Sequence, residues 1–203
     1  MTDEKTDYTR HNERMKRVQA ARERMQARRT LERGLLIVHT GNGKGKSSSA
    51  FGMAIRSLGW GMKVGIVQYV KGSWETGEKN FFQANPDLLT FEVMGEGFTW
   101  DTQDRARDIE AAKAAWERSK ELILDPDYDF IILDELNIVL RQDTLPIDEI
   151  VAFLNDRPMT KHICITGRNA KPELIAIADL VTEFEEVKHP FKGGFKAQKG
   201  VEY

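Results

Sequence analysis

The segment TGNGKGKS, residues 40–47, constrains the fold of this chain more than any other feature. It follows a short apolar run, GLLIVHT, and precedes a stretch of helical character from Ser47 to Leu58. Three glycines alternate along it, at Gly41, Gly43 and Gly45. They let the backbone curl so that successive N–H groups point at one anion, and the N-terminus of the following helix adds positive partial charge. A strand, a glycine-rich turn and a helix in this order predict a phosphate-binding loop.

Two side chains complete this loop, because Lys46 can reach the outer phosphates of a nucleotide and the Ser47 hydroxyl can bind Mg²⁺. The usual pattern G-x-x-x-x-G-K-[ST] has glycine at its first position, where this chain has Thr40. A purely structural glycine-rich turn is the alternative, which the ordered strand, GKS triplet and helix disfavour. We therefore predict that ATP binds here. The other expected nucleotide contacts are Thr40, Gly41, Asn42, Gly43, Lys44, Gly45 and Ser48.

A pair of carboxylates supplies the second half expected of such a site. The apolar run DFIIL, which ends at Leu133, predicts a strand, and Asp134 and Glu135 follow at its carboxyl end. Ligands of open α/β sheets bind at that edge. One carboxylate should hold Mg²⁺ directly or through water, while the other organises water or the phosphates. Mn²⁺ suits the same oxygen ligands. The alternative interpretation of Asp134 and Glu135 is that they cap the N-terminus of a helix.

Beyond the loop, short apolar runs alternate with helical segments. The predicted strands are residues 34–40, 64–70, 88–94, the DFIIL run, 162–166 and 180–184, and the predicted helices are residues 47–58, 102–124, 146–154 and 172–178. Asp101 is expected to cap the second helix, with Ala106, Ile109, Ala112, Trp116 and Ile123 on its apolar face. This alternation predicts an α/β, P-loop NTPase-like fold, with a mainly parallel sheet of about six strands and helices on both faces.

The first 33 residues differ from the rest, being rich in Arg, Lys, Glu, Gln and Ala. A thin apolar stripe recurs there at helical spacing, at Met15, Val18, Ala21 and Met25. Such a helix is too polar to fold well alone. It can be a solvated arm, or an arm that docks over a ligand or on a partner subunit. A nucleic-acid-binding arm is the least favoured alternative, because acidic residues are interspersed and aromatic residues are few. We predict an arm at 1–33 and a nucleotide-binding domain at 34–203.

Bulk composition excludes several classes of protein. The net charge of −2 does not indicate nucleic acid as a partner, and no apolar run approaches the ~20 residues that span a bilayer. The first residues lack the apolar stretch of a secretory signal. Cys164 is the single cysteine, which excludes an internal disulfide framework, and the four histidines lack metal-ligand spacing. We expect a cytoplasmic protein without nucleic acid or a membrane as partner.

Segments outside the phosphate loop carry a more specific pattern. They are AFGMAIRSLG at 50–59, VGIVQYVKG at 64–72, GFTWDTQDR at 97–105, LDEL at 133–136, ITGRNA at 165–170, and VKHPF and KAQKGVEY near the end. GFTWDTQ and the Lys-Ala-Gln-x-Gly tail are not general features of phosphate-loop proteins. With the basic arm and TGNGKGKS, they resemble the ATP:corrinoid adenosyltransferases that modify cobyrinic acid a,c-diamide or cobalamin, over nearly the whole chain.

That resemblance implies transfer of the 5′-deoxyadenosyl group of ATP to the cobalt(I) of a corrinoid, with release of triphosphate, in adenosylcobalamin biosynthesis or salvage. Because cobalt(I) is itself a strong nucleophile, the protein would position the substrates and stabilise charge on the leaving triphosphate. Lys46, Ser47 with Mg²⁺, and Glu135 or Asp134 would do this. The resemblance also implies a homodimer and an electron-donating reductase, a flavoprotein.

The resemblance also assigns side chains outside the loop. From residue type alone, Phe98 and Trp100 would be interpreted as aromatics that anchor a loop in the core. The resemblance implies another role, because aromatics at these positions in the family line the lower face of the corrin and exclude an axial ligand. Cobalt(II) without axial ligands is easier to reduce to cobalt(I). Arg56 and Arg168 match family positions near the nucleotide or corrinoid, and each is equally interpretable as a surface cation. The arm would pack over the site of its own or a partner subunit.

Two other functions remain open on the residues alone. A P-loop ATPase or small-molecule kinase would use Glu135 to orient a water or an acceptor at the γ-phosphate. A non-catalytic ATP-sensing module would bind partners through the basic arm. The guanine-specificity motif NKxD is absent, which argues against a GTPase, and GFTWDTQ and KAQKGVEY favour the adenosyltransferase because neither alternative has a use for them.

Overall fold

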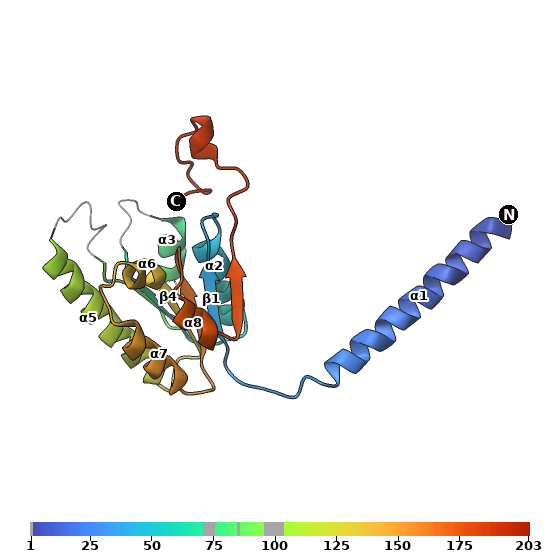
Figure 1. The fold of residues 1–203 in the computed structure, drawn as a ribbon, viewed down its shortest axis with the longest axis horizontal. Helices are drawn as coiled ribbons and strands as arrows, with labels where there is room; N and C mark the ends of the chain where they lie inside the picture. The colour runs from blue at the N-terminus through green and yellow to red at the C-terminus, as the bar shows by residue number, and fades with distance from the viewer. Residues whose placement is uncertain (1, 71–75, 85, 96–103) are drawn as a thin grey trace. The chain divides into compact units, whose positions relative to one another are not determined.

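The computed structural model describes residues 2–70, 76–84, 86–95 and 104–203 (Figure 1). Its contacts divide the chain into two compact units, Met1–Arg33 and Gly34–Tyr203. The larger unit carries the phosphate loop and the two carboxylates, so it is the unit that positions the predicted site.

A six-stranded sheet with the order β3-β2-β4-β5-β1-β6 forms the centre of the larger unit (Figure 1). Its strands are β1 Leu36–Thr40, β2 Val64–Gln68, β3 Leu89–Val93, β4 Phe130–Asp134, β5 His162–Thr166 and β6 Leu180–Glu183. Every neighbouring pair is parallel. The predicted α/β fold with about six parallel strands is therefore confirmed, and each strand is as long as its prediction or shorter by one or two residues.

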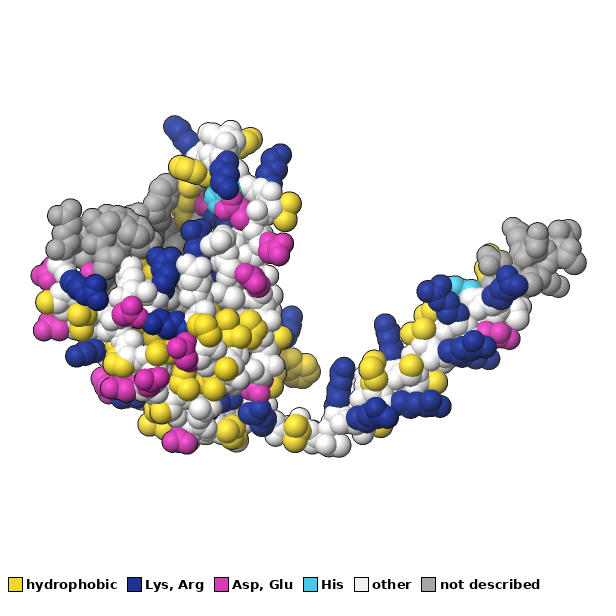
Figure 2. Space-filling view, in the orientation of Figure 1, with side chains coloured by type: hydrophobic (Ala, Val, Ile, Leu, Met, Phe, Trp, Pro, Cys, Tyr) yellow, Lys and Arg dark blue, Asp and Glu magenta, His cyan; other side chains and the backbone are white. Residues whose placement is uncertain are grey.

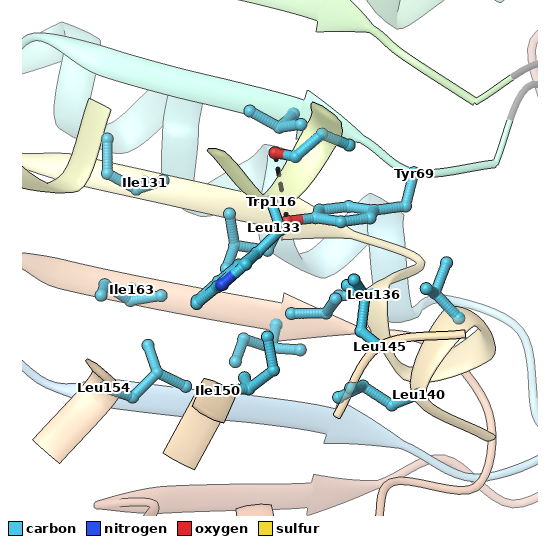
Figure 3. Packing of buried hydrophobic residues seen from close by; sticks show 14 of the residues in the cluster. Tyr69, Trp116, Ile131, Leu133, Leu136, Leu140, Leu145, Ile150, Leu154 and Ile163 are labelled. Atoms are coloured by element: carbon cyan, nitrogen blue, oxygen red, sulfur yellow. Dashed lines mark hydrogen bonds between the residues drawn. The ribbon is translucent and has the colours of Figure 1, made fainter. Parts of the chain in front are cut away.

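Helices cover both faces of this sheet, which explains why its central strands are almost wholly apolar. They are α2 Lys46–Gly59, α3 Gly77–Gln83, α5 Arg105–Leu124, α6 Leu136–Arg141, α7 Ile147–Asn155 and α8 Pro172–Ile177, and a 3₁₀ turn, η1, spans Pro190–Gly193. Alternate strand residues point to opposite faces. Leu133 therefore packs with Trp116 of α5 and Ile150 of α7 in one core cluster (Figure 3), whereas Ile132 packs with Phe51 of α2 in the other.

The long helix α5 begins later than predicted, at Arg105 rather than Thr102. The carboxylate of Asp104 accepts a hydrogen bond from the backbone N–H of Arg107, over 3.2 Å, and so caps the helix. Asp104 therefore takes the role predicted for Asp101, which lies outside the described residues. The expected apolar face is buried at Ala112, Trp116 and Ile123 and half-buried at Ile109, but Ala106 in the first turn is exposed.

Two short helices, α3 and α6, were absent from the prediction. They have seven and six residues, so neither completes the repeat that a periodicity argument requires. α3 is capped by Thr76, and α6 follows Glu135, whose backbone is in the left-handed region. The latter helix matters for the site because it starts directly after the predicted carboxylate pair.

The smaller unit is a single helix, α1, Thr2–Gln26, followed by an extended segment. Every described side chain from Tyr8 to Arg33 is exposed, including Met15, Val18 and Met25 of the apolar stripe. Lys and Arg side chains project along much of its length (Figure 2). Within the described residues, no helix is both long enough and apolar enough to cross a bilayer.

Candidate nucleotide-binding site

Polar side chains end four neighbouring strands at the carboxyl edge of the sheet. They are Gln68 of β2, Asp134 of β4, Thr166 of β5 and Thr40 of β1. Because all strands are parallel, these residues meet at one edge, which is the edge where open α/β sheets bind ligands. The phosphate loop leaves β1 at the same edge and leads into α2.

The backbone of the phosphate loop requires glycine at two points. Gly41 and Gly45 have φ values of 94° and 108°, a region that other residues rarely adopt. A side chain at Gly41 would also lie 2.4 Å from the carbonyl oxygen of Phe184. The loop is therefore built against the end of β6, and Gly45 turns the chain into the first residue of α2, Lys46.

Phe184, directly after β6, holds the loop from the side. Its backbone N–H donates to the carbonyl of Thr40 over 2.9 Å, and its carbonyl accepts from the N–H of Gly43 over 2.7 Å. Its ring meets that of His39 edge to face, with centroids 5.3 Å apart. His39 Nδ1 lies 3.2 Å from the carbonyl oxygen of Lys46, and burial lowers the pKa of this imidazole. The neutral ring can thus donate to the first turn of α2.

Lys46 is the cation at the centre of the loop. It is buried, and its ammonium donates to the carbonyl oxygens of Gly41, over 2.9 Å, and Gly43, over 2.6 Å. Burial lowers its pKa, and the negative charge of Glu135 opposes this shift. The loop therefore holds the ammonium inward, within electrostatic influence of the carboxylate that directly follows β4, the strand two places away in the sheet.

Asp134 is fixed in one orientation by two neutral donors. One carboxylate oxygen accepts from the hydroxyl of Thr166 over 2.7 Å, and the other accepts from the side-chain amide of Gln68 over 2.9 Å. Only 1% of its surface is exposed. Each partner lies on a strand beside β4, so the sheet itself aligns this carboxylate.

Glu135 has a strained backbone and a perturbed carboxyl group. Its φ is 63°, and its N–H donates to the hydroxyl oxygen of Thr166 over 3.0 Å. Burial, and next the neighbouring Asp134, raise its pKa to about 7, while Lys46 and Arg168 act in the opposite direction. Strained backbone and a shifted carboxyl beside two cations are typical of a functional site.

The loop after β5, residues 167–170, forms another part of the site. The side-chain amide of Asn137 donates to the carbonyl of Gly167, over 3.1 Å, and to that of His39, over 3.3 Å. At the other end of this loop, the N–H of Ala170 donates to the hydroxyl oxygen of Thr40 over 3.0 Å. The exposed Arg168 lies between these two attachments.

The structure therefore brings several of the predicted site residues into one neighbourhood. Charge coupling links Lys46, Glu135, Asp134 and Arg168. Ser47, half-buried, and Ser48, exposed, stand in the first turn of α2, and Asn42 is exposed on the loop.

Three other predicted site residues lie elsewhere or outside the description. Arg56 is exposed in the last turn of α2, away from the loop along the helix, and Phe98 and Trp100 lie outside the described residues. Lys44 forms an ion pair with Glu202 of the C-terminal tail. Over the described ranges, no three His, Cys, Asp or Glu side chains are grouped as a metal site. A cation here would instead use Ser47, a carboxylate and phosphate oxygens.

Four residues that shape the site were missed in the sequence. Thr166 ends a predicted strand, so a search for polar residues at every strand's carboxyl end would have found it. Gln68 lies inside the predicted strand 64–70 and ends β2 only because β2 is two residues shorter than that prediction. Asn137 and Phe184 carried no such signal, because their contacts depend on the sheet order and on helix α6.

Comparison with known proteins gives one consistent result. The family model described as ATP:corrinoid adenosyltransferase BtuR/CobO/CobP matches residues 32–203. A corrinoid adenosyltransferase of Pseudomonas aeruginosa is 54% identical over 194 residues, covering 96% of this chain and 96% of that protein. One of Sinorhizobium sp is 50% identical over 199 residues, covering 97% and 93%. One of Escherichia coli K12 is 43% identical over 194 residues, covering 96% and 98%.

Proposed function

The chain belongs to the ATP:corrinoid adenosyltransferase family and is an ATP-using transferase, and we propose how its residues carry out the transfer. The cobalt(I) of a corrinoid, cobyrinic acid a,c-diamide or cobalamin, attacks C5′ of ATP. The carbon–oxygen bond to the α-phosphate breaks, its electron pair leaves with triphosphate, and a cobalt–carbon bond forms. The single observation that carries this proposal is a phosphate loop in which the carbonyls of Gly41 and Gly43 hold the buried Lys46 ammonium, with charge coupling to Glu135 and Arg168.

The protein's contribution is to grip the leaving group. Triphosphate gains negative charge as the bond to C5′ breaks, and cations placed beforehand stabilise that charge most effectively. Lys46, amides of the loop and Arg168 serve this purpose, with residues 40–48 wrapped around the phosphates. Since the metal is the nucleophile, none of the side chains has to act as a general base.

Mg²⁺, or Mn²⁺, fits the oxygen ligands at the start of α2 and the end of β4. The pKa of Glu135 is raised partly because Asp134 is its neighbour, and a divalent cation beside the pair would favour the ionised form of both. We propose Ser47 and Glu135 as the direct ligands, with Asp134, already held by two donors, as their support. The ion would neutralise phosphate charge in the transition state.

Phe98 and Trp100 are proposed, from the family resemblance, to keep axial ligands off cobalt(II). We expect Phe98→Ala and Trp100→Ala to lower turnover of a cobalt(II) corrinoid roughly 10- to 100-fold, which corresponds to about 1.4–2.7 kcal/mol of barrier. Chemically prepared cobalt(I) corrinoid should restore much of the rate. The measurement is the rate of adenosylated corrinoid formation with each oxidation state, and unchanged turnover of cobalt(II) in both variants contradicts the assignment.

We propose that the chain forms a homodimer and that residues 34–203 form its substrate-binding domain. We also propose that the arm at residues 1–33 packs over a substrate site of that dimer. Its exposed apolar stripe, at Met15, Val18 and Met25, is the surface that such packing would cover. We expect deletion of residues 1–30 to raise KM for ATP or corrinoid about tenfold, the factor equivalent to 1.4 kcal/mol of contacts. Steady-state kinetics test this, with sedimentation of the truncated chain as the control; unaltered KM for both substrates removes the role.

The reaction also needs a supply of electrons and of ATP. We propose a flavoprotein reductase as the electron donor. We propose the cytoplasm as the location, since thiols such as that of Cys164 stay reduced there. Neither proposal affects the chemistry at C5′.

The experiment that tests the proposed reaction follows the transferred carbon. ATP labelled with ¹³C at C5′ is mixed with the protein, Mg²⁺ and cobalt(I) cobalamin in the dark. The proposal expects the label to appear bonded to cobalt and to be released on exposure to light. A P-loop ATPase or kinase would leave the label in ADP, and an ATP-sensing module would leave it in ATP.

A further inference from the structure

The side chain of Thr40 joins the phosphate loop to the loop after β5. Its hydroxyl oxygen accepts the N–H of Ala170 over 3.0 Å, and only 7% of the residue is exposed. The usual phosphate-loop pattern has glycine at this position, and glycine has no side-chain acceptor to offer this N–H. Thr40, at the first position of the motif, therefore makes a hydrogen bond that a glycine there would lack.

The backbone of Thr40 cannot easily move away from this contact. Its carbonyl accepts from the N–H of Phe184 over 2.9 Å, and Thr40 also pairs with Glu183 of β6 in the sheet. A β-branched side chain has few rotamers, so its hydroxyl is held in place. Thr40 is thus a fixed point to which the neighbouring loop is attached.

The loop that Thr40 holds carries Arg168. Its two attachments are Asn137 at Gly167 and Thr40 at Ala170, one on each side of the arginine. Gly167 and Asn169, which flank Arg168, have φ values of 124° and 57°, so the turn is tight and its geometry depends on those attachments. The guanidinium of Arg168 acts on the pKa of Lys46 and on that of Glu135.

We propose that Thr40 is a positioning residue that sets Arg168 against the triphosphate held by the phosphate loop, so that loop and arginine form one anion-binding site. This deepens the proposed function and rests on it for the identity of the leaving group. A triphosphate that departs whole carries more charge than a single transferred phosphoryl group, and a cation on a second loop meets it from another direction. Without the hydroxyl, the partly buried N–H of Ala170 loses its partner and Arg168 loses one of its two supports.

Inorganic triphosphate is the probe that isolates this role, with calorimetric Kd as the readout. We expect Thr40→Val to weaken binding about 3- to 10-fold, the range of one net hydrogen bond, and Thr40→Ser to restore most of it. Thr40→Ala is the second variant should the valine variant fail to fold. Thr160→Val, at an exposed position before the opposite end of β5, is the matched control and should bind as the wild type does.

A double-mutant cycle with Arg168→Ala decides between positioning and mere structural support. If Thr40 acts through Arg168, Thr40→Val has little further effect on Kd in the Arg168→Ala background. Full additivity, or equal losses in the serine and valine variants, overturns the proposal. Inorganic triphosphate does not react, so the cycle measures the coupling between Thr40 and Arg168 independently of the reaction. The coupling can therefore be observed even if the labelled carbon of ATP stays in ADP and the proposed reaction is wrong.

Discussion

Replacing Lys46 with alanine is expected to lower kcat/KM for ATP by about 10²–10³-fold, the usual loss when one preorganised charge-stabilising donor is removed. The ammonium is buried in the loop and held by the carbonyls of Gly41 and Gly43, so it is placed before the nucleotide binds. Steady-state kinetics at saturating cobalt(I) corrinoid provide the measurement.

Two comparisons separate this loss from general damage. Lys113→Ala, on an exposed position of α5, should retain wild-type kinetics. Corrinoid affinity of Lys46→Ala should stay within a few-fold of the wild type, because the loop is proposed to hold only the triphosphate. A Lys46→Ala variant that keeps kcat/KM within tenfold would show that the loop does not stabilise the leaving group.

Glu135→Gln is expected to lower kcat/KM about 100-fold and to change its pH dependence. The pKa of Glu135 is raised to about 7 by burial and by Asp134, so the wild-type carboxyl ionises near neutrality. If its ionised form holds Mg²⁺, wild-type kcat/KM rises with pH through about 7, since this parameter reports the free enzyme. The glutamine variant should show no such rise.

The same shift predicts the pH dependence of stability without substrates. A carboxyl whose folded pKa is raised from 4.5 to about 7 stabilises the fold when protonated. Between those values the native state binds more protons than the unfolded state, so this group lowers the unfolding free energy by up to about 1.4 kcal/mol per pH unit as pH rises. Denaturant unfolding at several pH values measures this slope, and the Glu135→Gln variant should lack it. The control variant Glu110→Gln, at an exposed position of α5, should keep it. Equal slopes in the wild type and both variants contradict the assignment.

Much of the fold could be predicted because its signals are local. The runs GLLIVHT and HICIT are apolar on both strand faces, and the glycines between β1 and α2 leave few alternatives to a phosphate loop. The predicted start of α5 was wrong by three residues because the sequence offers more than one aspartate as a cap. The backbone N–H of Arg107 donates to the carboxylate of Asp104. Helices α3 and α6 are too short for periodicity to reveal.

The sequence predicted the residues of the loop motif and the carboxylates at a strand end, but not the partners that orient them. Lys46, Asp134 and Glu135 follow from the motif and from a strand end, whereas the partners that orient them come from other strands. Thr166 and Gln68 reach Asp134 because β5 and β2 flank β4, and this order was not predictable. The attachment of Thr40 to Ala170 likewise joins positions 130 residues apart.

The phosphate loop thus has a proposed use that differs from the common one. In most proteins with such a loop, the terminal phosphate is attacked; here the whole triphosphate is proposed to leave from C5′. Lys46, Arg168 and the carboxylate-bound cation would then stabilise charge on a product rather than on a transferred group.

The identity of the phosphate product tests this claim most directly. The protein is incubated in the dark with ATP, Mg²⁺ and cobalt(I) cobalamin, and the phosphates are identified by ³¹P NMR while the adenosylated corrinoid is counted by absorbance. The account predicts one intact triphosphate for each adenosylated corrinoid and no ADP. ADP and phosphate formed at the same rate with and without corrinoid would contradict it.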